Sequence, residues 1–143
     1  MKCHECNGEN FERRAVELTT QVGKHVVTDR SVSRPVCLQC GAFTLPANTL
    51  ETVELRAALV AFSEALQATG GMLRFARKAL GLTQVELAER ISASSESVSR
   101  WEREERPMEP WVPLAILALV RGRLMPPPAD VRLEGESRTR KIG

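Results

Sequence analysis

The sequence predicts an α+β fold in which a small β-rich module is followed by an all-α module. All four cysteines and two Val- and Thr-rich segments lie within the first 40 residues, whereas apolar residues recur at helical spacing after residue 48. With 143 residues, 43% of them hydrophobic and 27% charged, the composition is that of an ordinary globular protein. We therefore expect one domain or two small ones, each with a packed core.

Overall charge and hydropathy say little about a partner. The formal net charge of +2 neither indicates nor excludes nucleic acid, so motifs must decide the function class. No run of 18 or more apolar residues is present, and Met1-Lys2-Cys3 does not open a charged and then apolar leader. These features predict a cytoplasmic protein without a membrane partner.

Residues 1–47 are expected to form the β-rich module. Segments 15–22 and 24–28 are rich in Val and Thr and are separated by Gly23, which predicts a β-hairpin that turns near this glycine. Asn48 is then a plausible helix N-cap with Glu51 as its capping-box partner. Apolar residues follow along one helix side, which predicts a linker helix over 48–71 that stops at its two final glycines.

Residues 72–123 are predicted to form four short helices, with breaks at Gly81, at Ser92-Ala93, at the prolines from 107 to 113 and at Gly122. Periodicity predicts that the inward-facing side chains are Leu73, Ala76, Leu80, Val85, Ala88, Ile91, Val98, Trp101 and Trp111. It places Arg74, Arg77 and Lys78 on the outside. Residues 124–143 contain three successive prolines and few large apolar side chains, which predicts a disordered tail.

The cysteines form two pairs of the same spacing, Cys3 with Cys6 and Cys37 with Cys40. Disulfides are rarely kept in a reducing cytoplasm, and two such pairs can supply the four thiolates of a tetrahedral zinc site. The four-cysteine set therefore predicts structural Zn²⁺ in a zinc ribbon, because four protein ligands leave no open position for a substrate. Two redox pairs and two unliganded packed pairs are the alternatives, while His4 and His25 are expected to be bystanders.

The next motif covers two consecutive helices. Thr83 and Glu86 form a predicted capping box at the start of one helix, and Ser94 can cap the next. In that second helix the side opposite Val98 and Trp101 carries four polar residues, and these are Ser95, Glu96, Ser99 and Arg100.

The stretch GLTQVELAERISASSESVSRWE resembles the repressor-type helix-turn-helix shared by phage repressors and many bacterial regulators. It departs from that family at the turn, where Ser92 stands in place of the common glycine. The resemblance implies that Gln84 and Ser94 contact DNA phosphates, and that four residues face base edges, namely Ser95, Glu96, Ser99 and Arg100.

Side-chain chemistry agrees with several of these roles. Arg100 can take guanine O6 and N7 together, and Glu96 can accept from cytosine N4. Free N–H groups at helix N-termini support phosphate contacts near Thr83 and Ser94, and Arg103 is a further phosphate candidate. The alternative for Arg100 is a surface ion pair with Glu96 at i,i+4 spacing.

Two CxxC pairs followed by such a helix-turn-helix resemble the MqsA-type antitoxins, also described as YgiT-type zinc-finger regulators. The resemblance implies the antitoxin of a type II toxin-antitoxin pair, whose zinc module binds the toxin and whose helical module dimerises and represses its own promoter. The sequence departs at Glu96, where such regulators more often place a neutral amide.

Dimerisation also has a physical basis in the sequence. Two recognition helices spaced by about 34 Å would read a palindromic operator in double-stranded DNA. Residues 113–121 are apolar nearly all round, more than one small core should bury, which predicts a homodimer contact.

The sequence thus predicts a sequence-specific transcriptional repressor and not an enzyme. The first alternative is a stand-alone zinc-ribbon and helix-turn-helix transcription factor without a toxin partner. A zinc- or thiol-dependent enzyme is the remote one, because no motif supplies a glutamate general base beside a vacant metal position.

Overall fold

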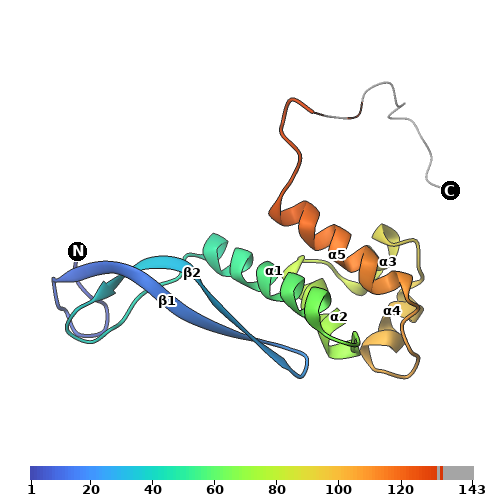
Figure 1. Cartoon of the computed structure of the whole chain (residues 1–143), viewed down its shortest axis with the longest axis horizontal. Coiled ribbons are helices and arrows are strands. Elements are labelled where there is room, and N and C mark those ends of the chain that lie inside the picture. The colour runs from blue at the N-terminus through green and yellow to red at the C-terminus, as the bar shows by residue number, and fades with distance from the viewer. Residues whose placement is uncertain (132, 134–143) are drawn as a thin grey trace.

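The computed structural model describes residues 1–131 and 133. A long β-hairpin lies beside the first helix, and four further helices gather at the end of the molecule opposite the cysteines (Figure 1). The elements are β1 (Phe11–Val22), β2 (His25–Cys37), α1 (Ala47–Glu64), α2 (Gly70–Ala79), α3 (Gln84–Arg90), α4 (Ser95–Glu102) and α5 (Trp111–Leu124). This confirms the predicted α+β class and the hairpin.

The hairpin turns at Gly23, whose φ of 61° is in the left-handed region that favours glycine. A β-bulge interrupts the antiparallel pairing, since Glu17 on β1 lies opposite both Arg30 and Ser31 on β2. Asp29 stabilises the bulge by accepting hydrogen bonds from the backbone N–H of Ser31 at 2.9 Å and from its hydroxyl at 2.6 Å.

The same carboxylate connects the hairpin to α1. Arg56 Nε donates to Asp29 Oδ2 at 2.8 Å. Partial burial raises the pKa of Asp29, but the hydrogen bonds from Ser31 and Arg56 outweigh this effect and hold the pKa below its usual value. The bulge is therefore fixed against the helix by a charged contact.

Two apolar cores support the fold. The smaller core joins the hairpin to α1 and consists of Val16, Val32, Val36 and Val53. The larger core combines residues of all five helices with Val22 at the hairpin tip, which is fully buried. Both ends of the hairpin are thus anchored, one of them inside the helical core. Among the described residues, no helix is long and apolar enough to cross a bilayer.

The linker helix predicted over 48–71 is wrong in its bounds. Helix α1 ends at Glu64, and the two glycines expected to stop it are instead the first residues of α2. The reason is Thr69, whose hydroxyl accepts from the backbone N–H of Met72 at 3.3 Å and so caps a new helix. Asn48 is not an N-cap either, because the cap position is Pro46 without a side-chain hydrogen bond.

Four helices in this part of the chain are confirmed, and so are most predicted core positions, but the breaks predicted at Pro113 and Gly122 are wrong, because both residues lie inside α5. Val85 is an exception, since it is 55% exposed and the buried place on α3 belongs to Leu87. Trp111 is 40% exposed and meets Trp101 edge to face. Of the predicted disordered tail over 124–143, Leu124 still belongs to α5, residues 125–131 form no helix or strand, and 132 and 134–143 lie outside the described residues. The division into four parts remains a prediction.

Candidate nucleic-acid interface and metal centre

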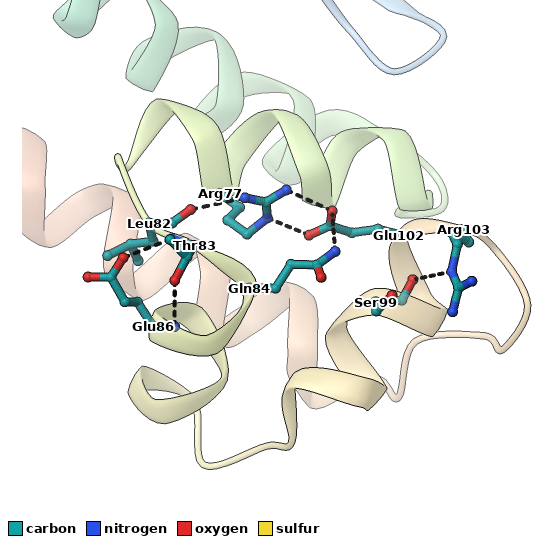
Figure 2. Close-up of polar contacts among 8 residues, drawn as sticks. All are labelled: Arg77, Leu82, Thr83, Gln84, Glu86, Ser99, Glu102 and Arg103. Atoms are coloured by element: carbon teal, nitrogen blue, oxygen red, sulfur yellow. Dashed lines mark hydrogen bonds and ion pairs between the residues drawn. The ribbon is translucent and has the colours of Figure 1, made fainter.

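Helix α3 begins with the predicted capping box. The backbone N–H of Glu86 donates to Thr83 Oγ1 at 3.1 Å, and the backbone N–H of Thr83 donates to Glu86 Oε1 at 3.0 Å (Figure 2). The bond from the Thr83 backbone lowers the pKa of Glu86 below its usual value. Both partners satisfy N–H groups that the first helical turn leaves free.

The turn between α3 and α4 contains Ser92 with a φ of 57°. A non-glycine residue in this region costs on the order of 1–3 kcal/mol, so the surrounding structure must enforce it. The backbone N–H of Ala93 donates to the carbonyl of Ala88 at 2.8 Å and closes the turn. Ser92 thus adopts the conformation for which the resembled family commonly has glycine.

Helix α4 is oriented by its buried side. Ser94 caps it by accepting from the backbone N–H of Ser97 at 3.1 Å, and Val98 and Trp101 are almost completely buried. Because the inner side is fixed, the predicted base-reading side faces outward, and its members are Ser95, Glu96 and Arg100, which are exposed, and Ser99, which is half-buried. Arg100 forms the predicted alternative contact, an ion pair with Glu96.

The predicted phosphate-contacting residues lie at the ends of α3 and α4. Thr83 and Ser94 are exposed at the N-termini of α3 and α4. Gln84 is half-buried, and its side-chain amide donates to Glu102 Oε1 at 3.3 Å. Arg103 is exposed after α4, where its guanidinium lies 3.2 Å from the carboxylate of Glu105.

A buried ion pair joins α2 to α4, and sequence reasoning missed it by placing Arg77 outside. Arg77 Nε donates to Glu102 Oε2 at 2.7 Å and Nη2 to Oε1 at 3.0 Å, so the contact is bidentate (Figure 2). The two side chains are only 12% and 4% exposed. Arg77 also donates to the carbonyl of Leu82 at 3.0 Å.

One signal could have revealed this pair. Glu102 ends α4, where the helix dipole disfavours a carboxylate, so an acidic residue there indicates a cationic partner. Because Gln84 also donates to Glu102, a single carboxylate holds residues of α2 and α3 against the end of α4.

The comparison with known protein families identifies the domain that contains α2, α3 and α4. Residues 73–108 match the helix-turn-helix family. The chain contains a helix-turn-helix domain. The match runs from α2 past α4, and such domains bind DNA sequence-specifically through the major groove. A search of the curated proteins gave no match.

At the other end of the molecule, the four cysteines form one cluster. Their sulfur atoms all lie within 4.8 Å of one another, and the shorter separations are 3.5 Å for Cys3 with Cys40 and 3.6 Å for Cys6 with Cys37. Each CxxC turn ends in a left-handed residue, Asn7 with φ 61° or Gly41 with φ 79°.

This geometry fits a tetrahedral metal site. With Zn–S bonds of about 2.3 Å, the sulfurs of a tetrahedral site are roughly 3.8 Å apart. Backbone hydrogen bonds, first that of Cys40, lower the pKa of Cys37 to about 7. For Cys40 the backbone bond of Ala42 lowers the pKa, but burial and the other three sulfurs outweigh it and raise the pKa to about 12. Four sulfurs this close resist full ionisation unless a cation compensates their charge.

The histidines do not join the cluster. His4 Nε2 lies 3.3 Å from the carboxylate of Glu5, and its side chain is mostly exposed. His25 is exposed at the hairpin tip, at the end of the strands opposite Cys37.

The ion pair of Arg77 with Glu102 generates a stability prediction. Arg77→Ala should lower the free energy of unfolding in urea by about 3–5 kcal/mol, because Glu102 is left buried without its cation. Arg30→Ala, which breaks an exposed pair with Glu17, is the matched control and should cost about 1 kcal/mol or less. Equal losses for the two variants would contradict the role of the buried pair.

Proposed function

We propose that this protein is a transcriptional repressor that binds an operator as a homodimer and reads base pairs with α4. The observation that carries the proposal is the match of residues 73–108 to the helix-turn-helix family. It is supported by the outward side of α4, where Ser95, Glu96, Ser99 and Arg100 lie opposite the buried Val98 and Trp101.

Arg100 is the leading candidate for direct base reading. Its ion pair with Glu96 is exposed, and such pairs contribute about 0–1 kcal/mol. Arg100 can therefore leave Glu96 and bind a guanine at little cost in free energy. A bidentate arginine contact with guanine contributes about 1–3 kcal/mol of discrimination. Glu96 then becomes free to accept from a cytosine N4 nearby.

Phosphate contacts would fix the register of α4 on the duplex. Thr83 and Ser94 present helix N-termini, which favour anions, and Arg103 adds a cation at the opposite end of α4. Gln84 is less available to bind a phosphate, because its side-chain amide already donates to Glu102.

The proposed dimer contact is an apolar strip along α5. Trp111, Leu114 and Ala118 are exposed at spacings that place them on one side of the helix, and Leu114 is 68% exposed. Exposed apolar side chains that line up in this way mark interaction sites. In a two-fold symmetric dimer, the strip of one copy would pack against the same strip of the other.

For the cysteine cluster we propose structural Zn²⁺ held by Cys3, Cys6, Cys37 and Cys40. A bound ion would join the two CxxC turns and compensate part of their thiolate charge. The closed four-sulfur set supports a structural site over a catalytic one.

A toxin partner is a finer proposal that rests on the resemblance to the MqsA-type antitoxins. In this account the zinc module binds the toxin while the helix-turn-helix domain binds DNA. Purification of the full chain from its native host, followed by mass spectrometry, would distinguish an antitoxin with a toxin partner from a stand-alone regulator. A stoichiometric small protein is the expected result, and a chain recovered alone would favour the stand-alone regulator.

DNA reading by α4 predicts different effects for two arginines. On a duplex selected by the protein from a random library, Arg100→Ala should weaken binding by about 1–3 kcal/mol and relax preference at one base pair. Arg103→Ala should weaken binding to selected and random duplexes alike. It should also reduce the slope of log K against log salt concentration by about one, as expected for the loss of one phosphate contact. Equal losses on both duplexes for both variants would refute the assignment.

The zinc proposal predicts which side chains retain the ion. Metal analysis of the purified chain should find one zinc, and Cys37→Ser should lose it because the tetrahedral set is broken. His4→Ala, a neighbouring change outside the cluster, should keep the full zinc content. Zinc retained by the cysteine variant, or lost from the histidine variant, would contradict the ligand set.

The dimer proposal predicts that charge on the α5 strip separates the two copies. Leu114→Glu should shift the sedimenting species from dimer to monomer, because like charges then face each other across the two-fold axis. Val26→Glu places the same charge at an exposed valine of the hairpin and should leave the dimer intact. A wild-type chain that sediments as a monomer at micromolar concentration would contradict the proposal.

A further inference from the structure

Three backbone segments from distant parts of the chain stack directly on one another. They are the hairpin turn at Gly23, the first turn of α2 at Gly70 and Gly71, and the last turn of α4 at Trp101 and Glu102. A Cβ atom added to Gly71 would lie 3.1 Å from the Cα of Gly23. One added to Gly70 would lie 2.4 Å from the carbonyl oxygen of Trp101 and 2.5 Å from that of Glu102.

These distances mean that the backbones of α2 and α4 meet directly at Gly70, and that those of α2 and the hairpin turn meet directly at Gly71. Contacts below 3.0 Å are shorter than real Cβ atoms make, so any other residue at position 70 would push α4 away from α2. At position 23 the nearest atoms to an added Cβ are the backbone nitrogen of Met72 and the hydroxyl oxygen of Thr69, both at 3.1 Å. The glycines thus allow a continuous backbone contact from the hairpin tip to the end of α4.

Two further contacts hold the stack together. Val22, directly before the turn, is fully buried in the helical core and keeps the hairpin tip in place. On the other side, Glu104 Oε1 accepts from the backbone N–H of Gly70 at 3.1 Å. Glu104 reaches this position with a φ of 58°, so the loop after α4 is bent toward the start of α2.

Resting on the proposed DNA-reading role of α4, we propose that the hairpin tip positions this helix for specific binding. Helix α4 has only eight residues, and its last turn carries both the glycine contact and the ion pair of Glu102 with Arg77. A displacement at this end therefore moves Arg100 and Ser99 as well. A displacement of the hairpin tip would therefore change the affinity for specific DNA, although no residue of the tip contacts DNA.

Two glycine variants with matched controls test this positioning. Gly70→Ala introduces the backbone clash, and Gly122→Ala is the control in another helix, where an added Cβ meets nothing within 4 Å. Gly23→Ala adds a contact and strain at positive φ, and Gly41→Ala, compared with the wild-type chain at equal zinc content, carries the same type of strain in open space. Each full-length variant is titrated with the selected duplex and with a random duplex.

The two stack variants should bind the selected duplex about tenfold more weakly, a loss in the range of one misplaced base contact. Their affinity for random duplex and their salt slope should stay within about twofold, because no phosphate contact is removed. Both controls should match the wild-type chain. A loss of the same size on both duplexes, or no loss on either, would overturn the proposal.

A second measurement guards against a variant that fails to fold. Glu104→Ala should also lower specific affinity, and Glu104→Gln should restore it, since an amide oxygen still accepts from Gly70. In the free Gly23→Ala protein the amide resonances of residues 95–102 should shift, and unchanged resonances would overturn the positioning role. If the wild-type chain selects no sequence at all, the proposed function itself fails; if it does and the variants match it, only the positioning fails.

Discussion

The buried ion pair of Arg77 with Glu102 sets the relative placement of α2, α3 and α4. Apolar packing alone would allow these short helices to slide and rotate, because hydrophobic contacts have no direction. A bidentate guanidinium and carboxylate contact allows few orientations, and Glu102 also accepts from Gln84 on α3. The surface that carries Ser95, Glu96 and Arg100 depends on this arrangement, although none of the three residues takes part in it.

The opposite end of the molecule depends on a different constraint. The core between the hairpin and α1 is small for two strands of this length, since it consists of four buried valines and the partly buried Leu18, Phe43 and Leu45 packed against them. Four thiolates this close repel one another, so bound Zn²⁺ would compensate their charge and support this end of the molecule by joining the two CxxC turns. The hairpin then carries this support to the helical core through Val22 at its tip.

Local chemistry explains what the sequence could predict. The capping box of Thr83 with Glu86, the cap at Ser94, the hairpin turn at Gly23 and the two CxxC pairs all depend on residues a few positions apart. The buried partner of Arg77 lies 25 positions away, and periodicity had placed this arginine on the polar side of its helix. The glycines at 70 and 71 have a role that only the approach of α4 and the hairpin explains, so the sequence pattern assigned them to the end of a helix. The prediction for Val85 is wrong because the rotation of α3 about its axis is set by its packing against α4, which the sequence does not show.

The proposed function requires that the outward side of α4 contacts the DNA bases. The most direct measurement is a titration of the isotope-labelled full chain with its selected duplex, followed through backbone amide resonances. The largest shifts should occur over residues 94–100, with smaller ones at the start of α3 and at the hairpin tip around Gly23, and none along the rest of the hairpin. Shifts concentrated in residues 11–37, with α4 unchanged, would contradict the proposed function.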